Sequence, residues 1–310
     1  MFLVIVIINS YLWEKMNMKI SFPEAEKIEW SNEDNFIFAF SRLDYFTTEL
    51  QKKYNSNDIN DLLSYVLRII KKMLDTWESI FLIYSHNRDY VSACTLCRNI
   101  IDNLVIIYHI YMDSNEDERL FKHYLYVLDG ILCRHKNYPD YKQLVNNGQI
   151  PQNKFTALIA QVKDTKESDM ATKEFIFQQL KISPLYQENQ IINKIIETGN
   201  WRYKSLTISH KKEEKNQYSW SALYKKLNLN PSFSVYASYL SVFVHGLSIS
   251  NIDCDSLFEP ILDLSAINLN LTYAAVQEIY QEDIKQYNID FAQSETMKSF
   301  VYFTKNKKVF

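Results

Sequence analysis

Glycine and proline are scarce in this 310-residue chain, which contains only four glycines and six prolines. Turn-rich β-sandwiches, dinucleotide-binding Rossmann loops and phosphate-binding P-loops all need more glycine than this. Long helices with few tight turns remain, and the chain is long enough to bury a substantial core without covalent staples. The composition therefore predicts an all-α fold, a multi-helix bundle.

Cysteine is scarce as well, with Cys94, Cys97, Cys133 and Cys254 as the whole set. Such a set does not form a disulfide framework in a chain of this length, which indicates a reducing cytoplasm. Cys94 and Cys97 resemble half of a zinc knuckle, but no second pair follows at metal-ligand spacing unless Cys133 and His135 are recruited. We expect buried thiols, no metal site and no cofactor.

A long hydrophobic run and an excess of basic residues are also missing. The apolar run Met1–Asn9 is too short to span a bilayer, and it lacks a basic start and a small-residue cleavage site. Because Met16 and Met18 follow closely, we expect residues 1–30 to be a leader, either upstream of the true start or disordered. A weak membrane-surface anchor is the alternative, and no integral span is predicted. The net charge is −3, so a nucleic-acid partner needs a local basic patch.

Helical periodicity runs through most of the remaining chain. Residues 31–290 are predicted to form one helical domain, and residues 291–310 a terminal helix with a basic tail. The charged segment 163–169 is expected to be either a turn or an exposed face. The expected helices cover residues 31–54, 59–84, 89–112, 114–135, 154–181, 185–197, 231–246 and 257–287.

The helix expected over residues 89–112 is apolar around most of its circumference, which is typical of a central, buried helix. Arg98 and Asp102 lie four residues apart and share one face, and His109 returns within roughly 20° of Arg98. An isolated buried guanidinium is unfavourable by several kcal/mol, so Arg98 needs Asp102 or a group from another helix. Arg98, Asp102 and His109 thus form a polar stripe on this helix. Arg98 and Asp102 are either a structural ion pair that ties two helices together or part of a polar pocket in the bundle core.

A later helix carries a second polar face on the sequence YLSVFVHG, in which His245 follows Ser241 by four residues. His245 is either a satisfied core histidine or a group that titrates near neutral pH. The residues expected to line a pocket beside Arg98, Asp102 and His245 are Asn99, Asn103, His109, Tyr239 and Ser241.

The segment Asn200–Trp220 has the highest local density of basic and aromatic residues in the chain. Such a segment is either a solvated loop or a surface that contacts phosphates and stacks on bases. The candidate nucleic-acid-binding residues are Trp201, Arg202, Lys204, His210, Lys211 and Lys212.

Three short motifs, in the same order, resemble a bacterial family of all-helical domains of unknown function. They are Arg98-x-x-x-Asp102, Trp220-Ser221 and the late-helix segment that ends at His245-Gly246. The resemblance covers residues 35–285. The family pattern has glutamate at the position of Asp102. The aspartate side chain is one methylene group shorter, so any contact that it makes is shifted by about that length.

A more distant similarity is to the HEPN helical domains, many of which are metal-independent ribonucleases of defence and toxin systems. Their motif is an arginine, a polar residue and, a few residues later, a histidine. Arg98 and Asn99 keep the first two positions, but Asn103 stands where the histidine would be and cannot transfer a proton. His245 or His109 would have to replace it. This similarity also implies a homo-oligomer.

Two functions therefore stay open, and whether the protein is an enzyme is left undecided. In the first, the protein cleaves RNA or another phosphoester: Arg98 holds the phosphate, His245 is the general acid and base, and Asp102 orients one of them. In the second, the protein is a non-catalytic helical scaffold or sensing protein, and a network of Arg98, Asp102, Tyr239 and His245 fixes the packing of the helices.

Overall fold

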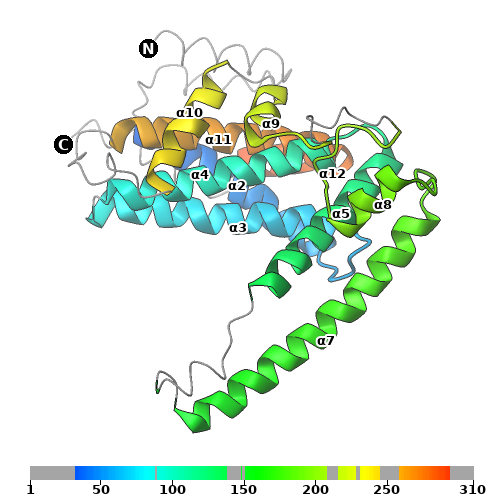
Figure 1. Ribbon diagram of the computed structural model, residues 1–310. Coiled ribbons are helices and arrows are strands. Elements are labelled where there is room, and N and C mark those ends of the chain that lie inside the picture. Colours follow the sequence, from blue (N-terminus) through cyan, green and yellow to red (C-terminus); the bar gives the residue numbers. More distant parts are fainter. Residues whose placement is uncertain are drawn as a thin grey trace, which may run out of the picture.

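The computed structural model describes residues 32–87, 89–137, 148, 151–207, 216–227, 231–244 and 258–293. Every regular element within these ranges is a helix, which confirms the predicted all-α bundle (Figure 1). The predicted leader, residues 1–30, lies outside the described residues, as does the tail beyond residue 293.

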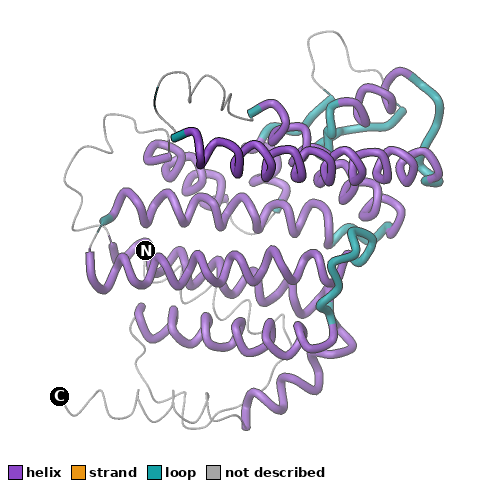
Figure 2. Tube along the Cα trace, turned by 90° about the horizontal axis from the view of Figure 1, so that it is seen from below, coloured by secondary structure: helices purple, strands orange, loops and turns teal. Residues whose placement is uncertain are grey.

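Five long helices form the body of the bundle. Helix α11 packs against α2 and α4, and α3 packs against the same two helices. Figure 2 shows the long helices running side by side. Two π-helical turns extend α3 and α4: η2 (Ile83–Asn87) and η3 (Ile107–Tyr111). The five helices are α2 (Asn32–Lys53), α3 (Leu62–Leu82), α4 (Tyr90–Ile106), α11 (Phe258–Ile279) and α12 (Gln281–Gln293).

Side-chain caps set where several helices begin. Asp61, Asp89 and Asn115 each accept a hydrogen bond from the backbone N–H three residues later, at 3.0, 3.1 and 3.1 Å respectively. Such caps satisfy backbone donors that have no partner inside the helix. The cap at Asp89 agrees with the predicted start of the central helix.

Helix α4 is central, as its apolar circumference predicts. It packs against α3, α10 (Pro231–Val244) and α11, and residues such as Ile100, Ile101 and Leu104 are fully buried. Within the described residues, the segment Tyr90–Tyr111 is long and apolar enough to cross a membrane, but more than half of it is buried inside the protein. Such burial is typical of a core helix. Cys97 is a free thiol in this core, and burial raises its pKa to about 12.

Helices α5 (Glu116–Lys136), α7 (Gln152–Ile182) and α8 (Gln190–Glu197) lie at one end of the bundle, and α7 projects away from the body (Figure 1). The charged segment 163–169 is helical, so the predicted turn is wrong. Most of its residues are exposed, as the alternative predicts, but Asp169 is buried. Arg134 and His135 of α5 both contact the Oδ2 atom of Asp169 in α7. The Arg134 Nε lies 2.9 Å from it and the His135 Nε2 lies 3.1 Å from it. These contacts join α5 to α7.

The last long helix differs from its prediction over residues 257–287. Helix α11 ends at Ile279, and α12 begins at Gln281. The phenol of Tyr280, between them, donates a hydrogen bond of 2.6 Å to the carbonyl of Leu63. This long-range contact holds the chain at the break between the two helices. No glycine or proline at this point of the sequence indicates that a helix ends here.

Helices α9 (Trp220–Lys226) and α10 (Pro231–Val244) complete the fold. Both contact each other, and α10 packs across α4. The candidate site lies where these helices meet α4.

Candidate functional site

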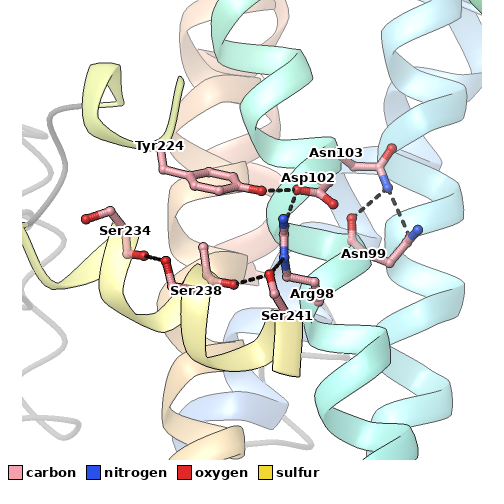
Figure 3. Close-up of polar contacts among 9 residues, drawn as sticks. Arg98, Asn99, Asp102, Asn103, Tyr224, Ser234, Ser238 and Ser241 are labelled. Carbon is pink, nitrogen blue, oxygen red and sulfur yellow. Dashed lines mark hydrogen bonds and ion pairs between the residues drawn. The ribbon is translucent and has the colours of Figure 1, made fainter. Parts of the chain in front are cut away.

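Arg98 projects from α4 toward α10 and is 12% exposed (Figure 3). Its Nε donates a hydrogen bond of 3.0 Å to Ser241 Oγ of α10. Its Nη1 donates to Asp102 Oδ1, one turn along the same helix. The ion pair that the four-residue spacing predicts is therefore present, and a second helix is tied to it.

Tyr224 brings α9 to the same point. Its phenol donates a hydrogen bond of 2.7 Å to Asp102 Oδ1, and its ring centroid lies 4.8 Å from the guanidinium carbon of Arg98. Burial is the main cause that raises the pKa of Tyr224, and the bond to Asp102 adds to it. We call Arg98, Asp102, Tyr224 and Ser241 the Arg98 node.

Several hydrogen-bonding groups of the Arg98 node are already engaged within the protein. The Ser241 hydroxyl accepts from Arg98 and donates to the Ala237 carbonyl at 2.8 Å, so its proton is already engaged. The Tyr224 proton is engaged by Asp102. Asp102 is 30% exposed and balances the charge of Arg98. An incoming phosphate would have to compete with this carboxylate for the guanidinium.

Asn99 and Asn103 point away from the Arg98 node (Figure 3). The Nδ2 of Asn103 donates to the carbonyl and to the side-chain oxygen of Asn99, at 2.9 and 3.1 Å. These two predicted pocket residues are hydrogen-bonded to each other on a different face of α4.

Tyr239 forms a second link between α10 and α4. Its hydroxyl lies 3.2 Å from that of Tyr90, and the side chain is 38% exposed. His245, the predicted acid and base, follows the end of α10 at Val244 and lies outside the described residues.

His109 packs elsewhere, against Trp201 and Tyr218, at centroid distances of 5.9 and 6.0 Å. The π-helical turn η3 begins at Ile107, and its wider turn shifts the helical register on which the shared stripe was predicted. Burial, with Lys122 and Lys226 as smaller causes, lowers the pKa of His109 to about 4. His109 is therefore neutral near pH 7.

Trp201 is a core residue, with 4% of its surface exposed. Its indole N–H donates to Asp129 Oδ2 of α5 at 3.2 Å. The loop comes this close because Gly199 has φ +60° and no Cβ, which would lie 2.7 Å from the Asp129 nitrogen. Burial raises the pKa of Asp129. The Trp201 ring is therefore occupied inside the protein.

Arg202 lies over Trp201 and Trp220, with its guanidinium carbon 5.6 and 5.1 Å from their ring centroids. Lys204 is exposed. The other candidate nucleic-acid-binding residues, His210, Lys211 and Lys212, lie outside the described residues. A nucleic-acid interface on this segment stays a prediction.

A buried arginine on α2 was not among the predicted site residues. Arg42 of α2 donates a hydrogen bond of 2.7 Å to Asn270 of α11, and its guanidinium carbon lies 3.9 Å from the Tyr273 ring centroid. Burial lowers the pKa of Arg42. Its partners are 228 and 231 residues away along the chain, so no local spacing could have found them.

Within the part of the chain that the structure describes, no three His, Cys, Asp or Glu side chains are grouped to hold a metal ion. Comparisons of the chain with known protein families, curated proteins and solved structures found no match in any of the three. The resemblances to the bacterial helical family and to HEPN domains stay predictions.

Proposed function

We propose that this protein is a non-catalytic helical scaffold or sensing protein of the cytoplasm, in which the Arg98 node holds α9 and α10 against the central helix. One observation carries the proposal: the guanidinium of Arg98 is engaged by groups from three helices while its side chain is 12% exposed. A mostly buried arginine that is paired with a carboxylate is typical of a packing contact, because removing one partner leaves an uncompensated charge.

Protonation adds support for a non-catalytic role. A general acid or base near neutral pH needs a pKa close to 7. His109 is partly buried and His123 is buried, and burial lowers the pKa of each to about 4. Neither is at the Arg98 node. A scaffold needs no such group.

RNA cleavage is the second candidate, and one contact favours it. The bond between Arg98 and Ser241 joins the helix with the candidate phosphate-binding arginine to the helix that His245 follows. In this alternative, Arg98 would hold a phosphate, Asp102 would orient Arg98, and His245 would transfer the proton.

The two candidates are separated by Asp102→Asn, measured for both stability and cleavage of single-stranded and structured RNA. The scaffold proposal expects a lower urea midpoint and no RNA turnover by either the native protein or the variant. Turnover by the native protein that disappears in an equally stable Asp102→Asn variant contradicts it. Asp75→Asn is the matched control, because Asp75 forms an exposed pair with Lys71, also four residues apart.

The partner expected for this scaffold is a second copy of the chain. The aromatic content of 15% and the HEPN resemblance favour such an assembly. Sedimentation of the full chain measures it, and a monomer mass at every concentration contradicts it.

A further inference from the structure

A cavity of about 430 Å³ lies at one end of the bundle, away from the Arg98 node. The lining residues come from five helical elements, close to where each begins or ends. The first residues of α3 and α12, Leu62 and Gln281, line the cavity, as do the last residues of η3 and α11, Tyr111 and Ile279. Arg119, near the start of α5, lines it as well. The volume is within the range of pockets that bind small molecules.

Part of the cavity lining is apolar, and we call this part the floor. It is formed by Leu62, Leu63 and Val66 from the first turns of α3 and by Ile279 from the last turn of α11. Tyr111 adds an aromatic wall, and the π-helical turn that carries it is a feature often found at functional sites. A small apolar group would be desolvated on this floor.

The rim carries charges of both signs. Arg119 has one ion pair, to Glu116 at 3.3 Å, and Glu116 is 89% exposed, so the pair is weak and exchangeable. Glu278 is exposed, and its carboxylate makes no hydrogen bond or ion pair with any residue that the structure describes. Asp113 is already neutralised by Lys122 at 2.9 Å. One cation and one anion are therefore available to a ligand.

We propose that this cavity binds a small zwitterion with an apolar side chain, of the chemical class of the hydrophobic α-amino acids. The ligand ammonium group pairs with Glu278, its carboxylate pairs with Arg119, and its side chain lies on the apolar floor. A simple carboxylic acid would leave Glu278 unpaired beside a like charge, and a simple amine would leave Arg119 with only its weak pair to Glu116. The zwitterion matches both charges.

This site shares no residue with the Arg98 node, so it stands or falls independently of the proposed function. A ligand site of this kind would give a sensing protein its input. It would bind whether or not the Arg98 node is structural.

Calorimetric titration of the full chain with L-phenylalanine and L-leucine tests the proposal. The comparison ligands are phenethylamine, which lacks the carboxylate, and 3-phenylpropionate, which lacks the ammonium group. At least one amino acid is expected to bind, and removal of either charged group from phenylalanine is expected to weaken binding at least about tenfold, the size of one charged contact.

Two rim variants identify the site. Glu278→Gln and Arg119→Gln are each expected to weaken amino-acid binding at least about tenfold. Glu282→Gln and Lys194→Gln remove the same charges at exposed positions that do not line the cavity, and they should bind as the native protein does. The proposal is overturned if neither amino acid binds at millimolar concentration, if an analogue lacking one charge binds as tightly, or if either rim variant keeps full affinity.

Discussion

The phenol of Tyr224 donates a hydrogen bond of 2.7 Å to Asp102, while its ring lies against the guanidinium of Arg98. One side chain of α9 therefore contacts both members of an ion pair on α4. Because Ser241 of α10 holds the other side of Arg98, three helices are fixed by one polar contact set inside an apolar bundle.

Tyr224→Phe removes the hydroxyl and keeps the ring over Arg98. We expect the free energy of unfolding to fall by about 1 to 2 kcal/mol, because a bond to a partly buried carboxylate is lost. Urea denaturation measures the loss. Tyr186→Phe is the control, since the Tyr186 hydroxyl makes only a long, exposed contact of 3.5 Å to Asn193. Equal loss in the two variants contradicts a special role for the Asp102 bond.

Buried His123 makes stability depend on pH. Its Nε2 lies 2.8 Å from the Ile59 carbonyl and its Nδ1 lies 2.9 Å from the Tyr111 hydroxyl, and burial lowers its pKa from 6.5 to about 4. Between pH 6.5 and about 4, the unfolded chain binds a proton on this histidine that the folded chain does not bind. Stability is therefore complete above pH 6.5 and falls with decreasing pH, by about 3 kcal/mol for this histidine at the lower limit.

The variant His123→Phe isolates this contribution. It is expected to be less stable than the native protein at pH 7.5, because the Ile59 carbonyl loses its donor, but to lose less stability between pH 6.5 and 4. The pKa of His109 is also lowered, so His109 contributes to the pH dependence of the unfolding free energy in both proteins. Identical slopes in the two proteins contradict a neutral, buried His123.

Gly199→Ala tests the close approach of the Trp201 loop to α5. The added Cβ would lie 2.7 Å from the Asp129 nitrogen, at a residue with φ +60°. We expect a loss of at least about 2 kcal/mol in unfolding free energy. Gly148→Ala is the matched control, because Gly148 has φ +69° and nothing within 4 Å of the added Cβ. A loss of the same size in both variants would mean that φ alone, and not the contact with Asp129, explains the glycine.

The sequence predicted those features that depend on local pattern. The apolar circumference of residues 89–112 predicted a central helix, and the four-residue spacing predicted that Arg98 and Asp102 share a face. Asp89, which caps that helix, lies at its predicted start. These properties arise within a few helical turns.

Features that depend on contacts between residues far apart in the chain could not be predicted from the sequence. No pattern announces η3, so the sequence placed His109 in line with Arg98 although it packs against Trp201. The break at Tyr280 depends on Leu63, and Arg42 depends on Asn270. Likewise, spacing along α4 says nothing about which distant helix supplies Ser241 or Tyr224.

The most direct test of the central claim, that Arg98 is a packing residue, is urea denaturation of Arg98→Met beside Lys71→Met. Lys71 pairs with Asp75 at the same four-residue spacing, but both side chains are exposed, at 44% and 61%. We expect the free energy of unfolding to fall by about 3 kcal/mol for Arg98→Met, and by under about 0.5 kcal/mol for Lys71→Met. Equal unfolding free energies for the two variants would contradict a structural role for Arg98.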